Sequence, residues 1–176
     1  MNILIAYASG FGSTKEIAEK IGQILQEPPA LQVTLQAMEA VTDVSPFDAI
    51  VLGSSIRADQ PLVSIMDFMA QNRTTLRQKN IAVFLVCLTA NCQCGRDKVR
   101  HEYISPIYEK YPDMNIISSE SFGGKIDFDK LNPVMQMLMK RVLEKTGIPA
   151  QGSVDTRDWN FISGWAHHLK EKLQTV

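Results

Sequence analysis

The chain has 176 residues, of which 45% are hydrophobic and 21% are charged, and its formal net charge is −1. This composition is that of a globular protein with a hydrophobic core, and we expect one domain over residues 1–176. The near-zero net charge does not support a strongly basic nucleic-acid-binding surface, and no apolar run reaches the roughly 18 residues of a membrane-spanning helix.

The cysteine content and the N-terminus indicate a cytoplasmic protein. Three cysteines, Cys87, Cys92 and Cys94, are too few for a disulfide framework. The first residues lack the charged segment and long apolar run of a secretory signal. We therefore expect a chain that starts directly with a strand and stays in the reduced interior of the cell.

Two strands and one helix are predicted at the start of the chain. Residues 2–8 form a continuous apolar run, which is typical of a strand buried on both faces. A helical repeat follows residues 9–14 and ends at Pro28 and Pro29. Its inward side chains are Ile17, Ala18, Ile21, Ile24 and Leu25. Residues 31–38 alternate apolar and polar side chains, which predicts a half-buried edge strand.

The middle of the chain predicts two more buried strands and two helices. The apolar runs 48–53 and 81–88 are the strands. Pro61 is expected to open the helix between them. Its inward side chains are Val63, Met66 and Met69. Residues 97–111 predict a second helix, which Pro106 should kink or divide.

A weaker strand and two helices complete the predicted elements. Residues 115–122 form the strand, and residues 129–145 form a methionine-rich helix that Gly147 should stop. Residues 151–155 have the composition of a linker. The last helix covers 155–173, with its buried side formed by Ile162, Trp165, Ala166, Leu169 and Leu173.

Alternating strands and helices predict an α/β fold, in which a parallel sheet is covered by helices on both faces. With five strands, the leading order is 2-1-3-4-5. In such a sheet, ligands bind beyond the carboxyl ends of the strands. Three segments occupy this position, namely Ser9–Thr14, Ser54–Gln60 and Thr89–Cys94. They follow the first, third and fourth strands, which are neighbours in this order.

The segment Ser9–Thr14 has the chemistry of a phosphate-binding loop. It combines three hydroxyl side chains, two glycines and the start of a helix, where free backbone N–H groups attract an anion. It lacks the GK[ST] ending of a nucleoside-triphosphate loop and the GxGxxG spacing of dinucleotide-binding folds. A monophosphate held by neutral donors fits best. The alternative is an ordinary strand-to-helix turn with a capped helix.

Several segments of the sequence resemble those of a known family. The segment Ser9–Thr14 resembles the phosphate loop of flavodoxins. Residues Gly53–Arg57 resemble a segment of the menaquinone-dependent, oxygen-independent protoporphyrinogen oxidases, a branch of the flavodoxin-domain proteins. The segments Gly123–Ile126 and Asp155–Trp159, and the methionine-rich helix between them, resemble the same branch.

The resemblance implies a flavodoxin-like fold and non-covalently bound FMN. The phosphate would be held by Ser9, Gly10, Phe11, Gly12, Ser13 and Thr14. The isoalloxazine ring would be flanked by Ser54, Ser55, Ile56, Arg57, Leu88, Thr89, Ala90 and Asn91. The implied function is an FMN-dependent oxidoreductase that passes electrons from a reduced substrate to a quinone or another acceptor. The alternatives are a non-enzymatic electron-transfer flavodoxin and a binding module that has lost FMN.

Two departures from electron-carrier flavodoxins favour the enzyme. Residues 54–60 and 89–94 contain no aromatic side chain to sandwich the flavin ring, and the chain is close to neutral instead of strongly acidic. Arg57 is expected at the ring edge, where it would stabilise reduced flavin or attract an acidic substrate. The alternative is a surface arginine paired with Asp59.

Two further features allow more than one interpretation. Cys92 and Cys94 are interpreted as free thiols in a loop, because two cysteines without further nearby ligands do not make a metal site. We predict no metal. The helix over 129–145 is interpreted as a core helix with a solvated basic face. The alternative is a helix that contacts a partner or the inner face of the membrane, where it would approach a quinone.

Overall fold

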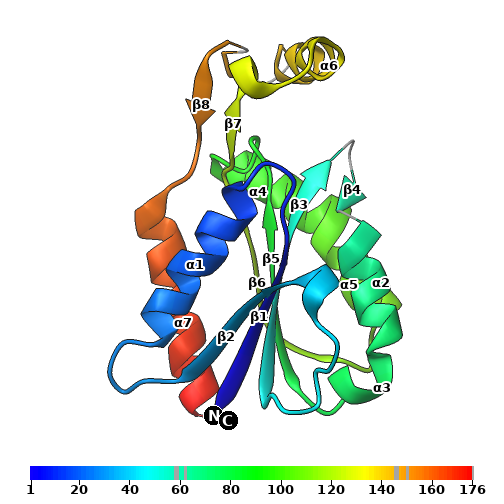
Figure 1. Ribbon diagram of the computed structural model, residues 1–176, viewed down its shortest axis with the longest axis vertical. Coiled ribbons are helices and arrows are strands. Elements are labelled where there is room, and N and C mark those ends of the chain that lie inside the picture. Colours follow the sequence, from blue (N-terminus) through cyan, green and yellow to red (C-terminus); the bar gives the residue numbers. More distant parts are fainter. Residues whose placement is uncertain (58–59, 62, 145–146, 150, 176) are drawn as a thin grey trace.

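The computed structural model describes residues 1–57, 60–61, 63–144, 147–149 and 151–175. Five parallel strands form the main sheet in the order β2-β1-β3-β5-β6 (Figure 1). This is the predicted order 2-1-3-4-5, counted over the five long strands. Their bounds are β1 Asn2–Ala8, β2 Gln32–Ala37, β3 Ala49–Arg57, β5 Asn80–Val86 and β6 Asn115–Phe122.

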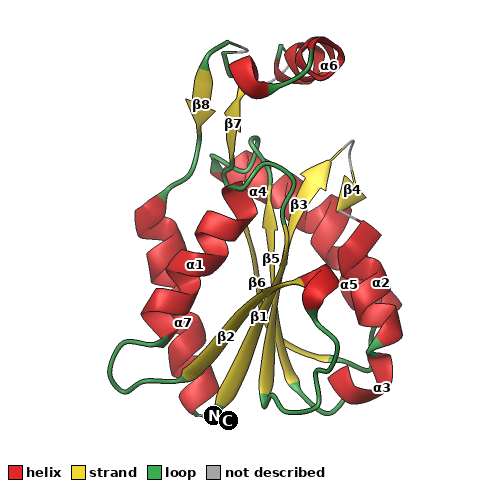
Figure 2. Ribbon diagram, in the orientation of Figure 1, coloured by secondary structure: helices red, strands yellow, loops and turns green. Residues whose placement is uncertain are grey.

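Helices cover both faces of the sheet (Figure 2). One face is covered by α1 (Ser13–Leu25) and α7 (Trp159–Gln174). The opposite face is covered by short and medium-length elements. They are η1 Met38–Ala40, α2 Val63–Gln71, α3 Arg73–Leu76, α4 Gln93–Val99 and α5 Ser105–Lys110. The predicted α/β architecture is confirmed.

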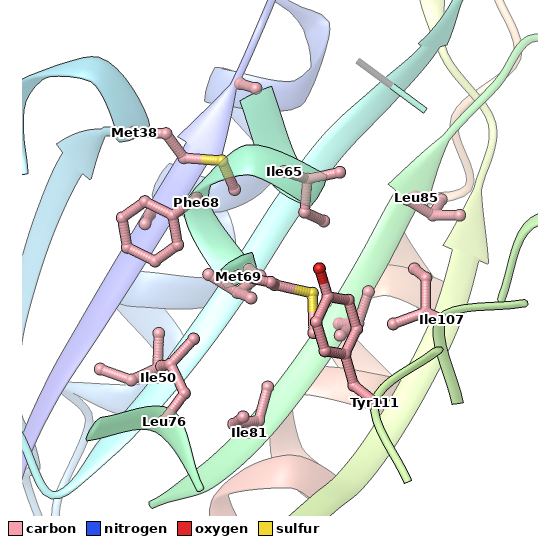
Figure 3. Close-up of a cluster of buried hydrophobic side chains, with 14 of the residues drawn as sticks. Met38, Ile50, Ile65, Phe68, Met69, Leu76, Ile81, Leu85, Ile107 and Tyr111 are labelled. Carbon is pink, nitrogen blue, oxygen red and sulfur yellow. The ribbon is translucent and has the colours of Figure 1, made fainter. Parts of the chain in front are cut away.

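Each strand contributes to two hydrophobic clusters, because successive side chains of a strand point to opposite faces. In β1, Leu4 and Ala6 join the cluster under α2 and α5, whereas Ile3 and Ile5 join the cluster under α1 and α7. Figure 3 shows the first cluster, in which Phe68 and Met69 of α2 lie over Ile50 and Ile81. The inward faces predicted for α1 and α7 are buried as expected.

The helix predicted over 97–111 starts earlier and is divided. It begins at Gln93 as α4, passes through the π-helical turn η2 (Arg100–Ile104) and continues as α5. Pro106 lacks the N–H that would continue the regular ladder, so the chain adopts the wider turn just before it. The Ser105 hydroxyl donates to the Arg100 carbonyl oxygen at 3.0 Å within this turn. The predicted division at Pro106 is confirmed.

Strand β3 is longer than predicted. Residues up to Arg57 continue the strand because β4 (Gln60–Pro61) pairs with its end in antiparallel fashion, with Ile56 opposite Pro61. The interpretation of Ser54–Arg57 as loop is therefore wrong. Pro61 lies in β4, and helix α2 begins two residues later at Val63. Of the expected inward side chains, Met69 is buried and Met66 half-buried, and that of Val63 lies outside the described residues.

A small antiparallel hairpin extends beyond the carboxyl edge of the main sheet (Figure 1). It consists of β7 (Lys125–Asp127) and β8 (Ser153–Asp155), and it carries η3 (Phe128–Lys130) and α6 (Pro133–Leu143) between its strands. The linker predicted over 151–155 is wrong, because most of it forms β8. Leu143 of α6 packs with Ile126, Phe128 and Leu131 in a separate buried cluster.

Helix α6 is shorter than the predicted helix and only partly buried. The side chain of Asn132 caps its start by accepting the N–H of Met135 at 2.9 Å. It ends at Leu143, and Gly147 follows with a φ of 70°. Val134 is 70% exposed and Leu138 48% exposed, so the core-helix interpretation is wrong for this face. The hairpin holds the helix away from the sheet, so one side has no partner among the described residues.

No helix among the described residues is long and apolar enough to cross a membrane.

Candidate functional site

The carboxyl ends of β1, β3 and β5 lie side by side. Ala8 pairs with Ser54 across β1 and β3, and Ser55 pairs with Val86 across β3 and β5. The segments that follow these strands therefore start next to one another, as predicted from the strand order.

The segment Ser9–Thr14 curls around the start of α1. The Ser9 hydroxyl oxygen accepts the N–H of Gly12 at 3.1 Å and that of Lys15 at 3.4 Å. Gly12 is the N-cap residue and has a φ of 90°, in the region that favours glycine. The N–H groups of Ser13 and Thr14 have no acceptor within the helix, because the first turn lacks preceding carbonyls. Gly10 and Phe11 are exposed at the tip.

Thr14 carries the most informative hydroxyl of this segment. The residue is 1% exposed, and its Oγ1 has no hydrogen-bond partner among the described residues. Leaving a buried hydroxyl unpaired costs about 1–3 kcal/mol. The neighbouring Ser13 is also buried, and its hydroxyl oxygen accepts the N–H of Lys125 at 3.0 Å, which ties the loop to β7. A ligand that accepts a hydrogen bond from Thr14 would relieve the unpaired hydroxyl.

Two more buried hydroxyls without a described partner lie at the same edge of the sheet. They belong to Ser55, near the end of β3, and Ser121, near the end of β6. The hydroxyl of Ser54 donates to the Ser55 carbonyl oxygen at 3.2 Å, and Ile56 is half-buried. The side chain of Arg57 lies outside the described residues, as does Asp59. Ser55 shares the sheet face of its register partner Val86, whereas Ser121 shares the opposite face with Leu85, so among the described residues the two hydroxyls lie on different faces of the sheet.

The third segment turns tightly after β5. The N–H of Ala90 donates to the Cys87 carbonyl oxygen at 3.0 Å, and Ala90 is buried. Leu88 and Thr89 are half-buried, and Asn91 is exposed. The Thr89 hydroxyl and the Cys87 thiol lie 3.1 Å apart and share a hydrogen bond. The side chains in this part of the edge are mainly apolar and small.

Thr156 joins this turn to the hairpin, a role that the sequence did not predict. Its Oγ1 lies 3.1 Å from the Leu88 carbonyl oxygen and 3.0 Å from that of Gly124, and it accepts the Gly124 N–H at 3.1 Å. The Thr156 N–H also donates to the Gly124 carbonyl oxygen at 2.9 Å. The segments 123–126 and 155–159 therefore meet beside Leu88.

Arg157 ties the hairpin to the first helix. Its side chain is 4% exposed, and its guanidinium pairs with Asp155 and with Glu16, each at 2.6 Å. The guanidinium also stacks on the ring of Trp159, 4.5 Å from its centroid. The hydrogen bonds from Arg157 lower the pKa of the Asp155 carboxyl, and Asp155, followed by Glu16, raises the pKa of Arg157. Asp155, two residues before Arg157, was the only local signal, and the second carboxylate partner, Glu16, lies 141 residues away.

A shallow groove lies elsewhere, along α6. Its lining residues are Pro133, Gln136, Met137, Lys140, Arg141 and Glu144. All six belong to α6 or follow it directly, so a single helix surface forms the groove. It is separate from the edge where the three strands end.

Comparisons with known proteins agree with this architecture. The family model for the flavodoxin domain matches residues 4–151. The flavodoxin of Fusobacterium nucleatum, solved with flavin mononucleotide bound, is 14% identical with a TM-score of 0.56, covering 97% of this chain and 98% of that one. An archaeal flavodoxin is 23% identical with a TM-score of 0.54, covering 70% and 85% of the two chains.

Flavodoxin 1 of Bacillus cereus is 18% identical with a TM-score of 0.53, covering 81% of this chain and 97% of that one. The comparison with curated proteins finds no match. At these identities the solved structures show a shared fold. The family model matches most of the sequence itself, and the chain therefore belongs to the flavodoxin-domain family.

Proposed function

We propose that this protein binds FMN at the carboxyl edge of its sheet, with the phosphate in the loop formed by Ser9, Gly10, Phe11, Gly12, Ser13 and Thr14. The observation that carries the proposal is the buried hydroxyl of Thr14, which has no hydrogen-bond partner in the described part of the chain and lies beside the N–H groups of the first turn of α1. Both are hydrogen-bond donors, and a phosphate oxygen is a strong acceptor. Membership of the flavodoxin-domain family supports the same ligand.

Electrostatics around the loop also suit an anion. Glu16 lies in the first turn of α1, where its carboxylate would repel a phosphate. Arg157 pairs with that carboxylate at 2.6 Å and offsets part of its charge, because the same guanidinium also pairs with Asp155. The N-terminus of α1 adds the positive end of a helix dipole. The phosphate would therefore be held mainly by neutral donors, with the charge of the nearby acid partly offset.

We propose that the flavin ring lies against the ends of β3 and β5, flanked by Ser54, Ser55, Ile56, Arg57, Leu88, Thr89, Ala90 and Asn91. The hydroxyl of Ser55 has no partner among the residues that the structure describes and could bond to a polar ring atom, and the turn after β5 offers an apolar surface. When bound, FMN supplies a ring that takes up and releases one or two electrons. Thr156 fixes the turn by its hydrogen bond to the Leu88 carbonyl oxygen.

The activity that we propose is electron transfer from a reduced small molecule to a quinone or another acceptor, as the resemblance to the menaquinone-dependent oxidases implies. No aromatic side chain occurs in residues 54–60 and 89–94, which leaves room for a substrate beside the ring. A non-enzymatic electron carrier is the second candidate, because the fold is shared with flavodoxins along nearly the whole chain.

Helix α6 supports peripheral contact of a cytoplasmic protein with the membrane. Its exposed apolar side chains are Val134, Met137 and Leu138. The helix also carries Lys140 and Arg141 and no acidic residue. Each basic side chain near an anionic leaflet contributes about 1 kcal/mol of attraction. Such contact would bring the site toward a lipid-soluble quinone.

FMN binding is tested by its fluorescence, which is quenched when the ring is buried. Riboflavin, which lacks the phosphate, is the matched ligand control. We expect FMN to bind much more tightly than riboflavin, because the N–H groups at the start of α1 would bind the phosphate, which riboflavin lacks. Equal affinities would contradict the phosphate assignment, and no binding of either would contradict the whole proposal.

The activity is tested anaerobically with FMN-loaded protein, protoporphyrinogen and a menaquinone analogue. We expect oxidation of the porphyrinogen that depends on the quinone. Reduction of protein partners without any small-molecule turnover would instead identify an electron carrier. FMN binding is measured separately, so failure of this assay leaves the cofactor assignment intact.

Membrane contact is tested by sedimentation with vesicles of phosphatidylglycerol or phosphatidylcholine. We expect binding to the anionic vesicles only, and loss of that binding in the double variant Met137→Glu and Leu138→Glu. Tyr108→Glu is the control, because Tyr108 is an exposed aromatic side chain of α5, away from α6. Unchanged binding of the α6 variant would refute the contact.

A further inference from the structure

Two thiols lie next to each other directly after the turn that follows β5. The Sγ atoms of Cys92 and Cys94 are 3.6 Å apart, within hydrogen-bond distance for sulfur, and both residues are exposed. A disulfide requires the two atoms at about 2.05 Å. Because residues two positions apart lie within about 7 Å even in an extended chain, a modest side-chain rotation suffices to close the bond.

The backbone around the two thiols is held in place. Cys92 caps α4 by accepting the N–H of Gly95 on its Sγ at 3.4 Å. A Cβ at Gly95 would lie 1.7 Å from the Thr89 carbonyl oxygen, so only glycine allows this close approach. The side chain of Gln93, the residue between the two cysteines, is also held in place by hydrogen bonds to the side chains of Arg96 and Asp97. The thiols are therefore presented together on a fixed support.

The two thiols are not equivalent. The N–H of Gly95 and the thiol of Cys94 both donate to the Cys92 sulfur, and these hydrogen bonds lower the pKa of Cys92. The same contact raises the pKa of Cys94, because its proton is held by Cys92 and a neighbouring thiolate disfavours a second negative charge. Cys92 thus carries the larger thiolate fraction, and Cys94 keeps its proton in the reduced pair.

We propose that Cys92 and Cys94 form a dithiol–disulfide exchange site whose substrates are small exposed disulfides. The Cys92 thiolate attacks one sulfur of the substrate disulfide, forms a mixed disulfide and releases one substrate thiolate. Cys94 then loses its proton and attacks the Cys92 sulfur, which releases the second substrate thiolate. The substrate gains two electrons and two protons as two thiols, and the protein dithiol becomes one disulfide.

The disulfide so formed is a reversible one. A bond between cysteines separated by one residue closes a small ring, and departures from relaxed disulfide geometry make the bond easier to reduce. Exposed and strained disulfides have the higher reduction potentials that are typical of labile and catalytic pairs. The site is independent of FMN, because none of its steps uses the flavin or the loop Ser9–Thr14.

The test uses the full chain, fully reduced and then equilibrated with mixtures of reduced and oxidised glutathione. Thiols are alkylated after acid quench, and the modified positions are identified by peptide mass spectrometry. We expect Cys92 and Cys94 to lose their thiols together in one intramolecular bond. Cys87→Ser is the matched control, because this third cysteine is half-buried outside the pair, and it should leave the reaction unchanged.

Single variants separate the two roles. Cys94→Ser should accumulate the mixed disulfide with glutathione at Cys92, because the resolving thiol is gone. Cys92→Ser removes the contact that raises the pKa of Cys94, but Cys94 still lacks the Gly95 N–H bond that lowers the pKa of Cys92 and still lies near Asp97. Cys94 in this variant should therefore react more slowly at neutral pH than Cys92 in Cys94→Ser, by about threefold for each unit by which its pKa is the higher. Circular dichroism of both variants confirms that the fold is retained.

The pH dependence of alkylation adds a second readout. In the wild-type protein, the rate for Cys92 should reach half its maximum at a lower pH than the rate for Cys94. Independent glutathionylation of both cysteines without an intramolecular bond would overturn the proposal. Equal rates in Cys92→Ser and Cys94→Ser would overturn the assigned order of attack.

Discussion

The substitution Thr14→Val should stabilise the protein without ligand but weaken its binding of FMN. Valine has nearly the shape of threonine, so the change removes one buried hydroxyl that has no partner among the described residues. Burying an unpaired hydroxyl costs about 1–3 kcal/mol, and the variant without ligand should be more stable by about 1 kcal/mol after imperfect packing is allowed for. For a chain of this size that raises the Tm by about 2–4 °C.

In the bound state the same hydroxyl is expected to donate to a phosphate oxygen. A hydrogen bond to a charged group contributes about 1.5–3 kcal/mol, so Thr14→Val should weaken FMN binding about 10- to 150-fold. Riboflavin binding should change little, because riboflavin has no phosphate. The assays are thermal unfolding without ligand and fluorescence titration with both flavins.

Thr156→Val is the matched control for the stability arm. Its hydroxyl has three partners, at the Leu88 carbonyl and at both backbone groups of Gly124. The same threonine-to-valine change should therefore destabilise the protein there, because two carbonyls and one N–H lose a partner. Destabilisation of the free protein by Thr14→Val, or an equal loss of FMN and riboflavin binding, would refute the role given to this hydroxyl.

Two further substitutions test contacts between distant parts of the chain. Arg157→Met should lower the free energy of unfolding at neutral pH by about 1–2 kcal/mol, a discounted value because both carboxylate partners are partly exposed. The pKa of Asp155 in the folded protein lies below its usual 3.8. The ion pair therefore contributes to the free energy of unfolding above pH 3.8, and this contribution is lost as the pH falls through the folded pKa. Urea unfolding should show this loss in the wild type, and the free energy of unfolding of the variant should depend less on pH. An unchanged pH dependence would contradict the role of Arg157. Trp165→Phe should cost about 1–2 kcal/mol, because it leaves the buried Ser118 hydroxyl, 3.0 Å from the indole nitrogen, without its donor. A double-mutant cycle with Ser118→Ala measures the coupling, and additive effects would exclude the hydrogen bond as the cause.

The main sheet illustrates what could be predicted from local pattern. Strand β1 has the predicted bounds, Asn2–Ala8, because a continuous apolar run is the signature of a strand buried on both faces. The alternation in β2 correctly placed it at the sheet edge. Once five strands alternate with helices, right-handed crossovers leave few orders, and the predicted one is observed.

The predictions failed where an element depends on a distant partner. Strand β4 has two residues and β7 and β8 have three each, which is too short to show a period of two. The helix over 129–145 was interpreted as a core helix with a solvated basic face. The hairpin lifts α6 off the main sheet, and Val134, Met137 and Leu138 are exposed instead.

The candidate site divides in the same way. The sequence by itself determined the loop Ser9–Thr14, because glycines, hydroxyls and a helix start are adjacent in the chain and need no other segment to be recognised. Only the tertiary structure decided that the Thr14 hydroxyl is buried with no partner in the described ranges and that Ser13 bonds to Lys125. It also decided that Arg157 reaches Glu16 across 141 residues. Burial and long-range pairing are properties of the path of the whole chain, so no window of sequence contains them.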